Sequence, residues 1–100
     1  MAKKYLVKNQ LRPKQAFKNE LVGLIAKINK DEVAERFLKD LLTPSEFNEL
    51  ALRWQIVKLL HRGLSIRNVA FRLGVAVSTV ERGARELKYS KSRGFYELLK

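Results

Sequence analysis

Two short helical segments joined at a glycine carry the residues whose types and spacing are best suited to chemistry. Residues 64–88 read LSIRNVAFRLGVAVSTVERGARELK, with Gly74 at the junction. A helix-turn-helix needs a glycine that adopts positive φ in the turn and a small residue where its helices cross. Ala70 supplies the small residue, and four apolar side chains would line the inner faces: Val69, Leu73, Val75 and Val80. This spacing predicts a helix-turn-helix, with a plain helical hairpin as the alternative.

The start of the second segment is the part of a helix-turn-helix that meets base edges in the major groove of DNA. Arg82 would donate two hydrogen bonds to guanine, and the hydroxyls of Ser78 and Thr79 would form hydrogen bonds with bases or phosphates. The residues expected at the bases are Ala76, Val77, Ser78, Thr79, Glu81 and Arg82. The cations expected to hold phosphates, and so to set the register, are Arg67, Arg72, Arg85, Lys88, Lys91 and Arg93.

Other kinds of chemistry find little support. The chain has no cysteine and one histidine, His61, so no metal site is predicted. The serines lack a G-x-S-x-G context, and the acids are scattered rather than paired, so we do not expect an enzyme. Trp54 and Phe71 are interpreted as core or interface aromatics rather than as ligand-stacking residues.

The charge of the chain favours a polyanionic partner. The formal net charge is +11. Residues 51–100 carry eleven Lys or Arg against three Asp or Glu, net +8, whereas residues 1–50 carry ten against seven, net +3. Such a field attracts nucleic acid without choosing a sequence, so non-specific nucleic-acid binding and a merely solubilising basic surface stay open as alternatives. No apolar run approaches a membrane span, and a soluble, cytoplasmic protein without a membrane partner is expected.

Apolar residues recur at helical spacing along most of the chain, and no segment alternates in the way of a strand. A first helix is predicted over 13–29, and a second over 31–42, where two acids lie at the positive end of the helix dipole. Ser65 is predicted to cap the helix that precedes Gly74. With a last short helix near 95–99, the predicted fold class is all-α, a helical bundle of five or six helices.

The segment LLTPSEF contains the clearest helix start in the chain. Thr43 is predicted as the N-cap, Pro44 as the first helical residue, and Glu46 as the residue that completes a capping box. The helix is expected to end where Gly63 supplies a left-handed residue. Its predicted inward face consists of Phe47, Leu50, Ala51, Trp54, Val57 and Leu60.

Residues 38–88 resemble the trp repressor superfamily of helix-turn-helix DNA-binding proteins, through LLTPSEFNELALRWQIVKLLHRG followed by ERGARELK. The resemblance implies an intertwined, trp repressor-like homodimer whose two heads bind double-stranded DNA at a palindromic operator. It favours a sequence-specific transcriptional regulator, a repressor, over a helical interaction module. LTPSE and GLSIRNVAFRLGVAVSTV also resemble the output domains of quorum-sensing response regulators, but the helix from Thr43 to Gly63 is longer than that type allows.

The same resemblance implies an effector pocket. In the tryptophan-sensing members the amino acid lies between the long helix and the recognition helix, and the matching positions are Thr43 from the neighbouring subunit, Arg53, Arg82, Gly83 and Glu86. The effector expected is L-tryptophan or another small amino-acid-like molecule. Two departures, a shorter turn between Gly63 and Ser65 and a carboxylate at position 86, make the chain more similar to the shorter-turn relatives than to the tryptophan sensors.

These inferences divide the chain into four regions. They are a basic N-terminal arm at 1–12, a helical dimerisation and core region at 13–63, the helix-turn-helix at 64–88, and a C-terminal tail with a short helix at 89–100. The predicted function is that of a sequence-specific, homodimeric DNA-binding regulator of transcription. A tryptophan-responsive repressor and a non-specific nucleic-acid-binding protein are the alternatives.

Overall fold

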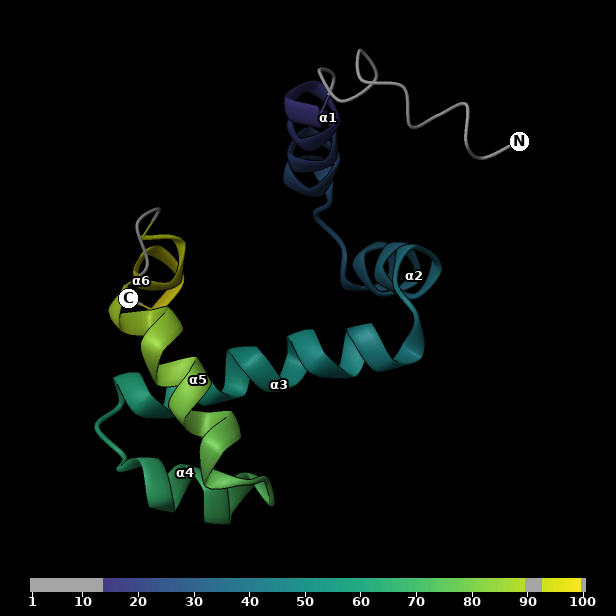
Figure 1. The fold of residues 1–100 in the computed structure, drawn as a ribbon. Helices are drawn as coiled ribbons and strands as arrows, with labels where there is room; N and C mark the ends of the chain where they lie inside the picture. The colour runs from purple at the N-terminus through teal and green to yellow at the C-terminus, as the bar shows by residue number, and fades with distance from the viewer. Residues whose placement is uncertain (1–13, 90–92, 100) are drawn as a thin grey trace, which may run out of the picture. The chain divides into compact units, whose positions relative to one another are not determined.

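The computed structural model describes residues 14–89 and 93–99, so the predicted N-terminal arm at 1–12 and Lys91 lie outside the described residues. Over these ranges the chain forms helices and no strand, which confirms the all-α prediction (Figure 1). The helices are α1 (Lys14–Lys27), α2 (Asp31–Leu41), α3 (Pro44–His61), α4 (Ile66–Leu73), α5 (Val77–Lys88) and α6 (Gly94–Leu99). The chain falls into two units, Met1–Leu41 and Leu42–Lys100, with the division inside the region 13–63.

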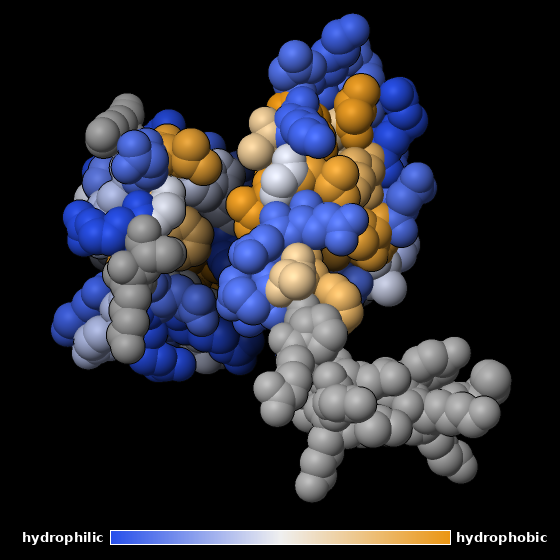
Figure 2. Space-filling model, turned by 90° about the horizontal axis from the view of Figure 1, so that it is seen from above, coloured by the Kyte–Doolittle hydropathy of each residue, from blue (hydrophilic) through white to orange (hydrophobic). Residues whose placement is uncertain are grey.

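The N-terminal unit consists of α1 and α2, and no residue of either helix is buried. Figure 2 shows hydrophobic side chains gathered over this unit. On α2, Asp31 and Glu32 lie at the positive end of the helix dipole, as predicted. One turn apart on the same helix, Lys39 donates to Glu35 at 2.9 Å, and this hydrogen bond and charge hold the pKa of Glu35 below its ordinary value.

Helix α3 begins with the predicted capping box. The Oγ1 of Thr43 accepts from the Glu46 amide at 3.1 Å, and the Glu46 carboxylate accepts from the Thr43 amide at 2.8 Å. Pro44 follows the cap, where its missing N–H costs no helical bond. At the other end Arg62 is the C-cap and Gly63 adopts φ +98°, so both predicted ends of this helix are confirmed.

The core lies in the C-terminal unit, where α4 and α5 pack against α3 and against each other. Its buried hydrophobic residues are Ile56, Val57, Leu59, Val69, Ala70 and Val80. Burial of a valine or leucine side chain contributes about 1.5–3 kcal/mol relative to exposure, so this cluster is what fixes α5 relative to the long helix. The residues predicted to face inward from the helix-turn-helix, Val69, Ala70 and Val80, are confirmed.

The inward face predicted for α3 was only partly right. Leu50 is 43% exposed and Ala51 is exposed, whereas the unpredicted Ile56 and Leu59 are buried. The physical reason is that α3 contacts α4, α5 and α6, so its buried surface extends beyond one stripe. Phe71 does not lie in the core, because its side chain is 91% exposed, and of its two predicted roles the interface role stays a prediction.

Helix α6 packs against α3 within the C-terminal unit. The Tyr96 hydroxyl donates to the Leu87 carbonyl at 3.3 Å, and the Tyr96 ring meets His61 edge-on at 6.0 Å between ring centres. His61 therefore has an aromatic neighbour, and the described residues contain no group of three or more His, Cys, Asp or Glu that could hold a metal ion. Within the described ranges no helix is both long and apolar enough to cross a membrane.

Candidate nucleic-acid interface and adjoining cavity

The two helices around Gly74 have the geometry of a helix-turn-helix. The Ser65 hydroxyl caps α4 by accepting from the Asn68 amide at 3.1 Å. Gly74 ends α4 with φ +69°, a left-handed conformation that suits glycine, and the Val75 amide donates back to the Ala70 carbonyl at 3.0 Å. The turn brings α5 across α4 and α3 (Figure 1). The sequence predictions for the cap and for the turn are confirmed.

The leading turn of α5 is open to solvent. Ala76, Val77 and Ser78 are exposed, and Thr79 is half-buried. Ala76 is the N-cap, yet no side chain accepts a hydrogen bond from the first turn, and that turn contains no acid. Farther along α5, Glu81 and Arg82 are also exposed. The residues expected at base edges are therefore accessible to solvent, although Thr79 is only partly accessible.

Exposed cations lie on α4, on the last turn of α5 and just before α6. The side chains expected at phosphates that the structure describes are all exposed: Arg67, Arg72, Arg85, Lys88 and Arg93. Lys88 lies over the Tyr89 ring, with Nζ 5.4 Å from the ring centre, and Arg93 lies 4.4 Å over the Tyr96 ring. No Asp or Glu occurs in the sequence between Glu49 and Glu81. This stretch, which includes all of α4, is therefore free of the side chains that would repel a phosphate backbone.

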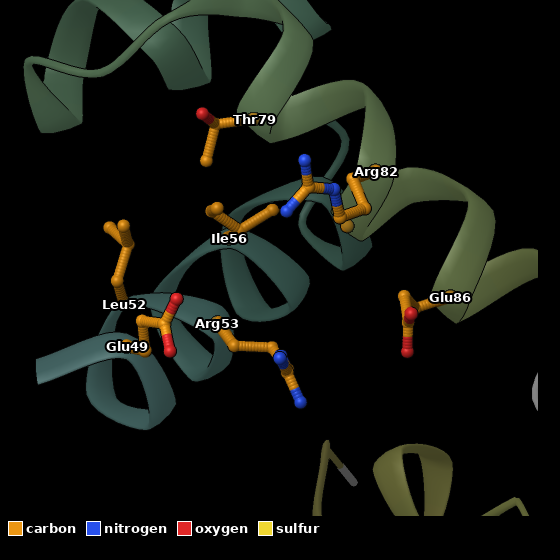
Figure 3. A pocket seen from close by; sticks show the side chains of 8 residues that line it. Glu49, Leu52, Arg53, Ile56, Thr79, Arg82 and Glu86 are labelled. Atoms are coloured by element: carbon orange, nitrogen blue, oxygen red, sulfur yellow. The ribbon is translucent and has the colours of Figure 1, made fainter. Parts of the chain in front are cut away.

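A cavity of about 280 Å³ lies between α3 and α5, next to the exposed helix start. Its lining contains four of the five residues expected at an effector pocket, Arg53, Arg82, Gly83 and Glu86. Thr43, the fifth, is not part of this lining. Figure 3 shows Arg82 reaching from α5 toward Ile56, and Arg53 extending from α3 toward the side where Glu86 lies.

Sequence reasoning missed three residues of this cavity, Glu49, Leu52 and Ile56. They share one face of α3 with Arg53, because positions three and four apart on a helix are neighbours. That spacing was the available signal. Thr79 also lines the cavity, although it was expected only at the DNA.

Helices α3 and α5 approach closely at the inner end of the cavity because residue 83 is a glycine. Gly83 is buried, and a Cβ at this position would lie 2.5 Å from the Cγ2 atom of Ile56. Ile56 is only 2% exposed and belongs to the hydrophobic core, so displacing its Cγ2 atom would disturb that packing. The hydrogen side chain of Gly83 therefore sets the separation of the two helices.

The charges of the cavity balance. Glu49 lies four residues before Arg53 on α3, and Arg82 lies four residues before Glu86 on α5, so each helix presents one cation and one carboxylate to the cavity. Between them lies the apolar surface of Leu52 and Ile56. Such a lining can hold a small molecule that carries both an ammonium and a carboxylate group beside an apolar body.

Comparison with known proteins gives one consistent result. Residues 17–100 match the family model described as Trp repressor protein. A Trp operon repressor homolog of Vibrio parahaemolyticus is 38% identical over 82 residues, which cover 81% of this chain and 79% of that protein. A Trp operon repressor homolog of Vibrio cholerae is 37% identical over 70 residues, 69% of this chain and 68% of that protein.

A third relative, the Trp operon repressor homolog of Vibrio campbellii, is 39% identical over 74 residues, 73% of each chain. No solved structure matches the chain. The family match spans the helix-turn-helix, the cavity and most of the N-terminal helices. The chain therefore belongs to the Trp repressor protein family of DNA-binding transcription regulators, which are not enzymes.

Proposed function

We propose that this protein is a homodimeric repressor that binds a specific palindromic DNA site with its helix-turn-helix. The observation that carries the proposal is the exposed leading turn of α5, held outward by the Val69 and Val80 packing and free of acids. A helix presented in this way can enter a major groove, which is about 12 Å wide. The exposed cations of α4 and α5 supply the affinity for phosphates that does not depend on sequence.

We assign the candidate residues to roles according to their exposure. Base reading falls to Ala76, Val77 and Ser78, whose side chains are exposed at the start of α5. We place Arg82 partly at the cavity, because its guanidinium group reaches toward Ile56 (Figure 3). Phosphate contacts are assigned to the exposed cations on both helices, Arg67, Arg72, Arg85 and Lys88.

The dimer is supported by the N-terminal unit. Helix α1 buries no residue, and its large hydrophobic side chains stay exposed, with Phe17 at 60%, Val22 at 64% and Ile25 at 50%. A helix of fourteen residues with an uncovered apolar surface is marginal in water and needs a partner surface. A second copy of the chain provides a self-complementary one, and its two-fold symmetry matches a palindromic site.

Selection of duplexes from a random pool tests this function. We expect enrichment of an inverted repeat whose half-sites lie about one helical turn, roughly 34 Å, apart, with two chains bound per duplex in sedimentation. A pool that shows no enrichment while still binding the protein at low salt would contradict the proposal and favour a non-specific nucleic-acid-binding protein. One chain per duplex would contradict the dimer.

An effector in the cavity is a second proposed function, supported by the mixed charges of its lining. The relatives are named Trp operon repressor homologs, so L-tryptophan is the ligand to test. We expect saturating L-tryptophan to raise the unfolding temperature, since a ligand that binds only the folded chain stabilises it, by about 2.7 kcal/mol at a hundred times Kd. Arg53→Ala should remove the shift.

Two analogues serve as controls for this measurement. Tryptamine lacks the carboxylate that the arginines would bind, and indole-3-propionate lacks the ammonium group that Glu49 and Glu86 would bind. Both should shift the unfolding temperature less than L-tryptophan does. An unfolding temperature that stays constant over millimolar L-tryptophan would exclude this amino acid as the effector.

A further inference from the structure

Phe71 on α4 is more exposed than any other large hydrophobic residue that the structure describes. Its side chain is 91% accessible, and it lines a surface depression of about 520 Å³ together with Leu64, Asn68 and Arg72. Val69 and Ala70 point into the core from the same helix, so α4 is already fixed without the ring. Folding of the chain therefore does not explain an aromatic side chain at this position.

The surroundings of Phe71 define what the surface can bind. Arg67 lies one helical turn before it and shares its outward face, and Arg72 is its neighbour in sequence and in the depression. Helix α4 contains no acid. A partner of this surface must therefore carry negative charge together with apolar groups within reach of the ring.

We propose that Phe71 packs against the deoxyribose backbone of the bound duplex, between phosphates held by Arg67 and Arg72. The first helix of a helix-turn-helix crosses the DNA backbone, and α4 packs directly on α5, so a duplex that receives the start of α5 comes close to α4. Deoxyribose offers an apolar face between two phosphates. An acidic protein would satisfy the same charges, but nothing would bring it to α4 in the way that binding at the exposed start of α5 brings a duplex there. The inference rests on the proposed function.

An apolar contact of this kind has a distinctive signature. It displaces no counterions, so it adds affinity without adding to the salt dependence of binding. Because sugars are the same along the duplex, it adds this affinity on any sequence. Loss of the ring should therefore lower affinity evenly, whereas loss of Arg67 should reduce the salt slope by about one.

The experiment measures Kd for the wild type and Phe71→Ala on the selected duplex and on a scrambled duplex, over a range of salt concentrations. We expect Phe71→Ala to weaken both by about three- to tenfold, as for partial burial of one aromatic ring, with an unchanged salt slope. Its unfolding temperature should stay constant because the ring is 91% exposed. Phe71→Leu should lose less affinity than Phe71→Ala.

Leu98→Ala is the matched control, since Leu98 on α6 is 78% exposed and should leave both affinities unchanged. If Phe71→Ala and Phe71→Leu bind both duplexes as the wild type does, the inference is overturned and an acidic protein becomes the candidate partner. An affinity loss confined to variants with a lowered unfolding temperature would overturn it as well. A wild type that binds no duplex would remove the proposed function, and this inference with it.

Discussion

Ser78→Asp is expected to lower affinity for the selected duplex by about 100-fold or more while leaving the protein slightly more stable. Ser78 is the second residue of α5 and is exposed. In the proposed complex a carboxylate there would lie inside the major groove, close to the phosphates on either side, and like charges at an interface cost several kcal/mol. The same carboxylate lies at the positive end of the helix dipole and should add about 0.3–1 kcal/mol to stability. Fluorescence anisotropy and urea unfolding measure the two effects.

The chain offers a matched control for this prediction. Ser45 is the second residue of α3 and is also exposed, but it lies outside the proposed interface. Ser45→Asp should give a similar gain in stability and change the Kd for DNA less than about threefold. Equal loss of DNA affinity in both variants would show that net charge alone decides binding, against a groove-facing α5.

Gly83→Ala is expected to lower the free energy of unfolding by about 1–2 kcal/mol. The new methyl group would lie 2.5 Å from the Cγ2 atom of Ile56, which is buried. Overpacking of this kind costs about 1–3 kcal/mol, more than the 0.5–1 kcal/mol or so that alanine contributes to a helix interior. Urea unfolding at one fixed chain concentration measures the difference, because the stability of a dimer depends on concentration.

Two further variants separate the steric effect from helix propensity. Gly23 lies within α1, where an added Cβ would meet no other atom of its own chain, so Gly23→Ala should raise the stability of each chain by about 0.5–1 kcal/mol. Ile56→Leu removes the obstructing Cγ2 atom and should restore part of the loss in the Gly83→Ala background. If Gly83→Ala proves as stabilising as Gly23→Ala, the close approach of α3 and α5 is not what the glycine provides.

The parts of the structure that sequence alone predicted are those fixed by neighbouring residues. The capping box at Thr43, the Ser65 cap and the left-handed turn at Gly74 each depend on a few consecutive positions, and all three are present. Their chemistry is local: a side-chain oxygen accepts an amide within three residues, or a glycine adopts positive φ. The helix-turn-helix could therefore be predicted from the Ser65 cap and the Gly74 turn.

The parts that sequence did not predict depend on contacts between distant segments. Helix α3 touches three other helices, so one periodic stripe could not identify Ile56 and Leu59 as core residues. For Phe71, hydrophobicity alone could not decide between the core and an interface, and the packing of Val69 and Ala70 on the inward side of α4 is what excludes the core. Glu49 lines the cavity because α5 crosses α3 at Gly83, a contact that the sequence around Glu49 does not reveal.

The start of α5 lacks a side-chain cap and should therefore be more mobile than the starts of α3 and α4. The side-chain oxygens of Thr43 and Ser65 cap the starts of α3 and α4, but Ala76 has no side-chain oxygen that could cap the start of α5. Such an oxygen contributes about 1 kcal/mol, so the first amide protons of α5 should exchange with solvent faster than those of its neighbours. The backbone is thus least restrained at the N-terminal end of α5, the end proposed to enter the duplex. This end can therefore adjust its conformation when DNA binds.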